Sequence, residues 1–319
     1  MKLKYIAKRT NELTEIERSR ICSLFEQIFE KEFSSEKFDG KYKAPVGGSS
    51  YHGLALSEEG EIVGCTATIP FVYDYFGQEK AFGLVVDSMI DPVYRKSIFA
   101  LKKMFDQSAE LMKNDGVSFV FAVPNDNAYQ YWLKIAGWKD IGNLDYFVLP
   151  VRIGAVVSRL GALNFLSSTF AQLINLPPVR DNGVSKESFP IAKTMNKSFL
   201  EYRYGAEYEL LRFSGDSFAY YRVYSEQAVR TAFIIDVFPL TKRNVEKTAK
   251  AIHAGEKSKI DIIVYAGNLG FKPRNLFPTP ARFAPRILRL CGKKIDDTLD
   301  DRVFEIDNWR YNLADLDVR

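Results

Sequence analysis

The sequence predicts an α+β fold in which a mixed, twisted and mostly antiparallel sheet is flanked by helices, in two successive lobes. Three observations support this prediction. Short apolar runs typical of strands alternate with amphipathic helical segments, a hairpin pattern precedes a strand–turn–helix unit, and the same order recurs in the second half of the chain. The length of 319 residues is sufficient for two domains.

The first elements follow from local patterns. Residues 4–7, Lys-Tyr-Ile-Ala, predict a first strand. Thr14 and Glu17 fit a capping box, and the residues after them repeat apolar side chains at helical spacing. Residues 37–50 are polar and rich in glycine, so we expect a loop there. Residues 51–76 contain two apolar runs around a Glu-Gly turn, which predicts a hairpin.

The most informative segment is a strand, a turn and a helix. Residues 82–91 read as a strand buried on both faces, which Pro92 ends. Apolar residues then recur at helical spacing from Ile98 to Met112. We expect the first turn of this helix to carry Arg95 and Lys96. Free amides, a helix dipole and two cations at one point form a cradle for an anion.

A second strand and a second helix follow this unit. Residues 117–123 form another apolar run, and Asn125-x-x-Ala128 then opens a short helix that ends in Gly137-Trp138.

These residues resemble the GNAT superfamily of acyl-CoA N-acetyltransferases. The matching pieces are Ile90-x-Pro92-x-Tyr94-Arg95, the helix after them, and Asn125-x-x-Ala128 closing in Gly137-Trp138. The resemblance covers residues 1–150. It implies a GNAT-like lobe, acetyl-CoA as co-substrate, no metal, and transfer of the acetyl group to a primary amine.

The resemblance also implies where acetyl-CoA would bind. Backbone groups of Met89 and Ile90 would pair with the pantetheine arm like an extra strand, and the amides of residues 95–100 would face the pyrophosphate. Lys96, Lys102 or Lys103 would neutralise the phosphates, the alternative for the last two being a solvated helix face. The implied cofactor-binding residues are Met89, Ile90, Arg95, Lys96, Ser97, Ile98, Phe99, Ala100, Asn125 and Asn127.

One position departs from the family pattern. The usual Arg/Gln-x-x-Gly-x-Gly/Ala run is here Arg95-Lys96-Ser97-Ile98-Phe99-Ala100. Arg95 and Ala100 match, but Ile98 stands in place of the first glycine. A β-branched residue restricts the close approach of backbone and phosphate that glycine permits.

The acid and the base have several candidates. Asp87 lies in an apolar strand, which should raise its pKa and suit it to act as the base, the alternative being a structural carboxylate. His52, on the first hairpin strand, is a second candidate for the base, although a structural role is favoured for it. For the acid, the family often has a tyrosine seven residues after the motif asparagine. That position is Trp132 here, so Tyr131 and Tyr129 are the candidates, the alternative being packing residues.

Composition and charge indicate which kinds of partner and which cellular compartment to expect. The formal net charge of +4 is too small to indicate a nucleic-acid partner. Cys22, Cys65 and Cys291 lie far apart without metal-ligand spacing, which predicts buried thiols in a reducing compartment and no metal site. The first residues carry no signal-peptide pattern and no run reaches ~18 apolar residues. We therefore expect a cytoplasmic protein without a membrane span.

The second half repeats the order of elements without the phosphate pattern. Residues 231–239 form a buried strand ended by Pro239, and a helix and a strand at residues 260–265 follow. Val245 and Lys247 stand where the two glycines would fall. We predict an acetyl-CoA-binding domain at residues 1–150, a helical connector and linker at 151–190, and a degenerate GNAT-like domain at 191–319. The connector could instead lie on a membrane surface, but its polar residues favour packing.

Three functions remain open from the sequence. The leading one is an N-acetyltransferase for a small primary amine, such as an amino sugar. The second is aminoacyl transfer from tRNA to a peptidoglycan cross-bridge. Labelling that depends on tRNA, without CoA binding, would support it. The third is a non-catalytic acyl-CoA-binding or scaffold protein, which would bind CoA without turnover.

Overall fold

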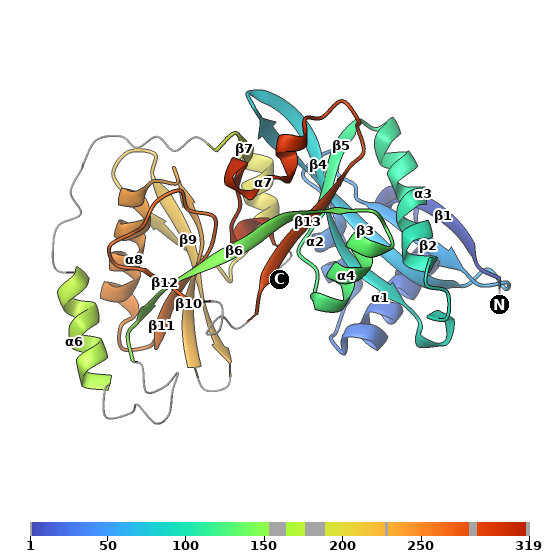
Figure 1. The fold of residues 1–319 in the computed structure, drawn as a ribbon. Coiled ribbons are helices and arrows are strands. Elements are labelled where there is room, and N and C mark those ends of the chain that lie inside the picture. Colours follow the sequence, from blue (N-terminus) through green and yellow to red (C-terminus); the bar gives the residue numbers. More distant parts are fainter. Residues whose placement is uncertain (1, 153–163, 176–188, 227–228, 281–285, 317–319) are drawn as a thin grey trace. The chain divides into compact units, whose positions relative to one another are not determined.

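The computed structural model has the predicted α+β fold, with a mixed and mostly antiparallel sheet (Figure 1). It describes residues 2–152, 164–175, 189–226, 229–280 and 286–316. The chain divides into two compact units. Unit 1 comprises residues 1–142, 190–203 and 289–308, and unit 2 comprises residues 143–189, 204–288 and 309–319.

These units are not the continuous segments that the sequence suggested. Their first boundary, after Gly142, lies within strand β6 (Lys139–Pro150) and not after Pro150. Residues 190–203 and 289–308 also return to unit 1. Much of the predicted connector and linker lies outside the described residues, which include helix α6 (Asn164–Asn175).

Unit 1 is built on a sheet with the strand order β1–β2–β3–β4–β5–β13. The strands are β1 (Lys4–Arg9), β2 (Tyr51–Leu56), β3 (Ile62–Tyr75), β4 (Gln78–Ile90), β5 (Val117–Ala122) and β13 (Leu288–Lys294). Neighbours run antiparallel except β4 and β5, which are parallel and are connected through α3 (Ala100–Asn114). The short β7 (Ile191–Lys193) pairs with the far end of β3.

Side-chain caps explain where three helices of unit 1 begin. In α1 (Glu15–Phe29) the predicted capping box of Thr14 and Glu17 is present. Asn125 accepts a hydrogen bond from the amide of Ala128 and so opens α4 (Asp126–Lys134). The expected loop at residues 37–50 is wrong in its first part, because α2 (Ser35–Tyr42) lies there, capped by Ser34.

The start of α3 also differs from the prediction. The helix begins at Ala100, so Arg95 and Lys96 precede it and do not lie in its first turn. A short 3-10 helix, η2 (Pro92–Tyr94), follows β4, and a turn then leads to α3. Pro92 favours this early turn because its ring fixes φ near the helical value.

The helices of unit 1 cover both faces of its sheet. Side chains alternate between the faces along β2. The α-carbon of Gly53 faces α3 so closely that an added Cβ would lie 2.1 Å from the carbonyl oxygen of Met104. The preceding His52 faces the other way and stacks on Phe38 of α2, with ring centroids 5.9 Å apart. Helices α3 and α2 therefore lie on opposite faces.

Unit 2 repeats the strand–helix–strand unit of unit 1. Its strand order is β6–β11–β10–β9–β8, with β8 (Glu209–Arg212), β9 (Phe218–Glu226), β10 (Val229–Phe238) and β11 (Ile262–Gly267). Strands β10 and β11 are parallel and are connected through α8 (Lys242–Glu256), as β4 and β5 are through α3. Unit 2 also contains β12 (Phe277–Pro278), β14 (Trp309–Arg310) and η7 (Leu313–Asp315). The remaining elements of unit 1 are α7 (Lys197–Arg203), η1 (Thr10–Glu12), η5 (Asp301–Phe304) and η6 (Ile306–Asn308).

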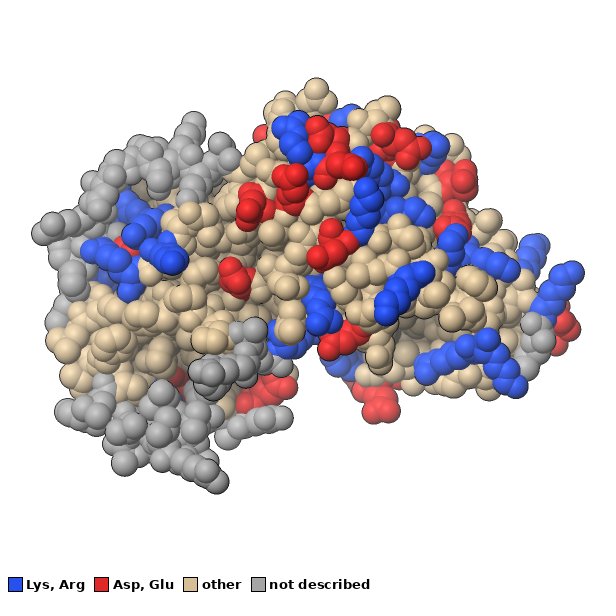
Figure 2. Space-filling view, viewed as in Figure 1, with Lys and Arg blue, Asp and Glu red and all other residues tan. Residues whose placement is uncertain are grey.

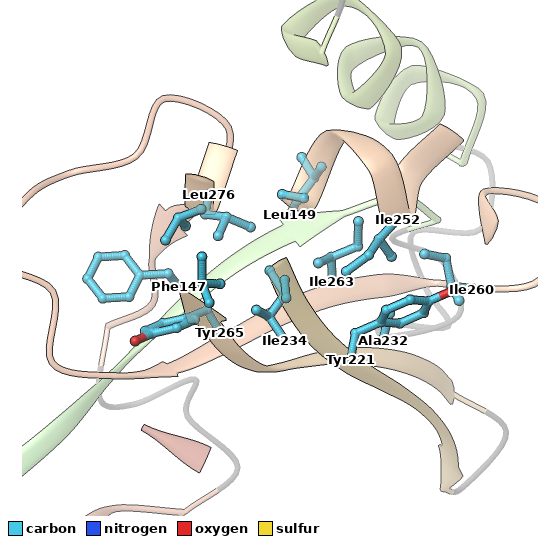
Figure 3. Packing of buried hydrophobic residues seen from close by; sticks show 14 of the residues in the cluster. Phe147, Leu149, Tyr221, Ala232, Ile234, Ile252, Ile260, Ile263, Tyr265 and Leu276 are labelled. Carbon is cyan, nitrogen blue, oxygen red and sulfur yellow. The ribbon is translucent and has the colours of Figure 1, made fainter. Parts of the chain in front are cut away.

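Each unit has its own hydrophobic core. In unit 2, Leu149, Ile234 and Ile263 of neighbouring strands pack with Ile252 of α8, and all four side chains are almost fully buried (Figure 3). In unit 1, Phe105 of α3 packs on Trp132 and Trp138 around α4. Burial of such side chains contributes most of the favourable free energy of folding.

Two further features concern the charge of the surface and the hydropathy of the helices. Figure 2 shows basic and acidic side chains interspersed over the face that it presents. None of the helices within the described ranges has the length and hydropathy of a transmembrane segment.

We predict that Gly53→Ala destabilises unit 1 by about 3 kcal/mol, because the new Cβ would overlap the backbone of α3 and force β2 and α3 apart. Urea denaturation followed by tryptophan fluorescence measures this change. Gly40→Ala in α2 is the control, since its Cβ would meet no atom within 4 Å. It should shift stability by less than about 1 kcal/mol. Equal effects of the two substitutions would contradict the packing described here.

Candidate active site

A pocket of about 340 Å³ lies in unit 1 where β4 ends. Its lining is mostly apolar, with a few polar groups. The lining residues are Ile28 of α1, Ser88, Met89 and Ile90 of β4, Arg95, Ser97 and Ile98 of the turn, Leu101 of α3, and Tyr131 of α4. An apolar pocket with few convergent polar groups is the usual form of a small-molecule or cofactor site.

The pocket exists because β4 and β5 separate. Their parallel ladder ends at the pair Leu84–Phe121, so the edge of β4 beyond it has no ladder partner on this side among the described residues. A bulge occurs at the same place, where Asp87 and Ser88 together oppose Thr66 of β3. Asp87 has a φ of +48°, a left-handed conformation that is uncommon for residues other than glycine.

The turn before α3 borders this pocket with unbonded amides. Phe99 occupies the N-cap position of α3 and supplies no side-chain hydrogen bond. Within the described chain, the amides of Ser97, Ile98 and Leu101 donate no hydrogen bond to a protein group. Such free amides at a helix N-terminus attract an anion through their dipoles. These amides lie at the start of α3, after Arg95 and Lys96, so the anion cradle stays a prediction for this later position.

Two residues of this turn have positions that the sequence did not indicate. The Nε of Arg95 donates a hydrogen bond to the carbonyl oxygen of Ile90, at 3.0 Å. The guanidinium is therefore folded back on the end of β4. Ile98, which replaces the family glycine, is 56% exposed and lies at the pocket rim. More than half of its surface is therefore open to solvent.

The lysines of α3 differ in their surroundings. Lys102 forms an ion pair with Asp106 one helical turn away. The ammonium of Lys103 lies over the ring of Tyr5, 5.4 Å from its centroid. Both remain on the surface of α3 and neither lines the pocket.

Tyr131 is the tyrosine that reaches the pocket. Its hydroxyl oxygen accepts a hydrogen bond from the amide of Lys102, at 2.9 Å, and so caps α3 from the neighbouring helix. Because the oxygen is the acceptor there, the hydroxyl proton can be directed into the pocket. Burial raises the pKa of Tyr131, so the hydroxyl carries its proton at neutral pH.

Tyr129 and Trp132 lie elsewhere. The hydroxyl of Tyr129 donates to Asp140 at 2.8 Å, and burial together with that carboxylate raises its pKa to about 12. Trp132 is 1% exposed and packs in the core between Phe105 and Trp138. Neither residue lines the pocket.

Asn125 and Asn127, which the sequence offered as cofactor-binding residues, lie at the start of α4 and outside the pocket lining. Asn125 uses its side-chain oxygen to cap α4, accepting from the amide of Ala128 at 2.9 Å. Asn127 is exposed in the first turn of that helix. Neither belongs to the pocket lining.

Asp87 has partners that the sequence did not reveal. Its Oδ2 forms an ion pair with the Nζ of Lys41 at 2.6 Å and accepts a hydrogen bond from the hydroxyl of Tyr42, also at 2.6 Å. Both partners come from the end of α2, which we expected to be a loop. The carboxylate is thus in a paired environment and not the apolar one that the strand pattern suggested. The spacing of Phe38 and Tyr42 by four residues was the available signal for this helix.

His52 is buried in the core beside this cluster. Its Nε2 lies 3.0 Å from the hydroxyl of Thr10, and its ring contacts Tyr42 edge-on. Burial, with a smaller contribution from Arg18, lowers its pKa to about 3. The imidazole is therefore neutral at physiological pH. Cys65, next to it, is buried as well, which raises its pKa.

No group of three or more histidine, cysteine or acidic side chains is arranged to hold a metal ion in the part of the chain that the structure describes. The pocket lining contains no such ligand set.

Comparisons with known proteins identify the fold. No protein-family model and no curated protein matches the sequence. Among solved structures, a GCN5-related N-acetyltransferase from Anabaena variabilis ATCC 29413 matches with a TM-score of 0.60 and 13% identity, over 92% of this chain and 73% of that one. A GCN5-related N-acetyltransferase from Kribbella flavida matches with a TM-score of 0.59 and 11% identity, over 92% and 71%.

A third structure agrees with these two. A probable N-acyltransferase of unknown function from Enterococcus faecalis V583 matches with a TM-score of 0.58 and 12% identity, over 92% of this chain and 73% of that one. The chain therefore has the fold of the GNAT superfamily, as the sequence predicted.

We predict that His52 makes the protein less stable in acid. Its pKa in the folded state, about 3, lies below the ordinary value of 6.5, so the unfolded chain binds more protons between these pH values. This contribution to stability is complete above pH 6.5 and is lost as the pH falls toward 3, at up to about 1.4 kcal/mol per pH unit. Urea denaturation of the parent and of His52→Gln from pH 7 to pH 4 measures it. The parent should show the steeper loss, and identical slopes would contradict this account.

Proposed function

We propose that the protein is an N-acyltransferase that moves an acetyl group from acetyl-CoA to the primary amine of a small acceptor. One observation carries this proposal: the pocket lies between the unpaired edge of β4 and the unbonded amides before α3. A strand-like polyamide arm and a pyrophosphate would satisfy these two sets of groups at once.

The proposed donor position follows from those groups. The backbone of Ser88 to Ile90 would pair with the pantetheine arm, after Arg95 releases the carbonyl oxygen of Ile90. The amides of the turn would hold the pyrophosphate, with Arg95 and Lys96 adding positive charge. Phosphate contacts of this kind depend on backbone amides, so Ile98 is compatible with them as long as its side chain stays at the rim.

The chemical step would use few side chains. A backbone amide of β4 near Met89 or Ile90 would stabilise the charge that develops on the thioester oxygen as the amine attacks. The carbon–sulfur bond then breaks, and the hydroxyl of Tyr131 would give its proton to the departing thiolate. The attacking amine would lose its proton to water, since no carboxylate or histidine lines the described pocket. For Asp87 we propose the separate role described below.

The acceptor is proposed to be a small molecule, for which an amino sugar is the test compound. In the sequence, Ile98 at the glycine position and Trp132 at the usual tyrosine position both favour the alternative of a non-catalytic scaffold. The presence of Tyr131 at the pocket supports an enzyme instead. Because the three structural neighbours share only 11–13% identity with this chain, they support the fold and not the acceptor.

We predict that acetyl-CoA binds to the parent protein in isothermal titration and that Arg95→Ala weakens it by at least about 10-fold, through loss of a charge-assisted contact. Tyr131→Phe should keep the affinity but lower the rate of thiol release with glucosamine by about 100-fold, as for a lost general acid. Arg302→Ala and Tyr75→Phe, at other places in unit 1, are the matched controls.

Three other outcomes would contradict the proposal in different ways. Absence of acetyl-CoA binding to the parent would exclude the donor. Binding without turnover on any amine of a panel of amino sugars and diamines would support a scaffold. Labelling from aminoacyl-tRNA without CoA binding would support the tRNA-dependent transferase.

A further inference from the structure

The bulge of β4 requires an unfavourable backbone conformation at a residue that has a side chain. Asp87 has a φ of +48°, whereas the ladder on either side of it is regular. An L-residue in this region is less stable than in an extended strand, so the surrounding structure must hold it there. Glycine would adopt the same conformation without that cost.

Helix α2 supplies the groups that hold Asp87. Its last two residues, Lys41 and Tyr42, both bond to the same carboxylate oxygen at 2.6 Å. The side chains of Lys41 and Asp87 are each only 9% exposed, so the attraction between their charges is weakly screened. Both contacts fix the position of the carboxylate relative to α2.

Lys41 is itself held by aromatic rings. Its ammonium lies 5.5 Å from the ring centroid of Phe25 and 5.9 Å from those of Phe33 and Tyr42. Phe25 and Phe33 stack with centroids 4.1 Å apart. A cation enclosed in this way has little freedom to move, which makes it a rigid anchor.

The residue after Asp87 connects this anchor to the pocket. Ser88 lines the pocket, and its hydroxyl lies 2.9 Å from the hydroxyl of Thr66 on β3. Met89, the next residue, also lines the pocket and pairs with Cys65 of β3. If Asp87 moved to an extended conformation, the bulge would be lost and the side chains after it would exchange faces of the sheet.

We propose that Lys41, Tyr42 and Asp87 form a positioning clamp, in which α2 holds Asp87 in its left-handed conformation and thereby keeps Ser88 to Ile90 at the pocket. In this role Asp87 is a positioning residue and does not act as the base. The functional part of this proposal rests on the proposed function, since it assumes that the pocket binds acetyl-CoA.

The first test measures the bulge without a ligand. In the full-length protein, amide hydrogen exchange of residues 84–90 should become about 10-fold faster in Lys41→Met than in the parent, because loss of the clamp permits local opening. Lys193→Met is the matched control. It removes another buried lysine of unit 1, on a strand that pairs with the opposite end of β3. Its effect on this segment should be less than about 2-fold.

The second test uses the difference between glycine and alanine at position 87. Lys41→Met combined with Asp87→Gly removes the whole ion pair but allows the left-handed conformation, so slow exchange should return. Lys41→Met combined with Asp87→Ala removes the same charges but retains a Cβ, so exchange should stay fast. Acetyl-CoA affinity, measured by titration, should follow the same order.

These experiments distinguish failure of the proposed clamp from failure of acetyl-CoA as the proposed acyl donor. Equal behaviour of the glycine and alanine double variants, or unchanged exchange in Lys41→Met, would overturn the clamp. If the exchange results follow the expected order but the parent does not bind acetyl-CoA, the clamp is supported and the proposed donor is excluded. The double variants also cover poor folding of Lys41→Met, since they remove both members of the Lys41–Asp87 ion pair.

Discussion

The separation of β4 from β5 beyond Leu84 and Phe121 is the constraint on which unit 1 depends. Parallel strands normally continue their ladder, because an unpaired backbone group away from water costs free energy. Here the ladder ends in mid-sheet, and the connection to α3 starts at the same edge. The unpaired strand edge, the unbonded amides and the hydroxyl of Tyr131 meet at one pocket for that reason. This departure from regular pairing therefore leaves an open edge of β4 beside the turn and α4, which supply the other polar groups of the candidate site.

The two faces of the sheet contribute differently to this arrangement. On the face covered by α2, Lys41 and Asp87 are buried as a pair and His52 is buried in its neutral form. Burial of charge is unfavourable unless a partner and further contacts compensate for it. The aromatic rings around Lys41 and the hydroxyl of Tyr42 provide those contacts. In the proposed clamp this polar interior supports the bulge, and in the proposed function the groups at the pocket carry the chemistry.

Local patterns were readable in the sequence, and contacts between distant segments were not. The sequence predicted the helix starts at Thr14 and Asn125, because a cap involves residues only three positions apart. It also predicted the order of helices and strands along most of unit 1, because each element has its own local pattern. Helix α2 is short and polar, and its partner Asp87 is 45 residues away, so no periodic pattern revealed the pair. Likewise, β13 returns from the C-terminal part of the chain to pair with β5. Such long-range pairing follows from the tertiary structure and leaves no local signal.

Unit 2 has a similar strand–helix–strand arrangement, but side chains of the chain itself contact the corresponding strand and helix start. Strand β10 also has a bulge, next to Asp236, and its ladder with β11 ends at Ile234. Here Arg310 donates to Asp236 and to the carbonyl oxygen of Val237, at 2.8 Å and 3.0 Å. Helix α8 is capped by the side chain of Thr241, whereas Phe99 gives α3 no such cap. In unit 2 the carbonyl oxygen of Val237 and the start of α8 thus have side-chain partners from the chain itself. Because paired groups have less need of a ligand, the described contacts favour a ligand at the end of β4 over one at the corresponding end of β10.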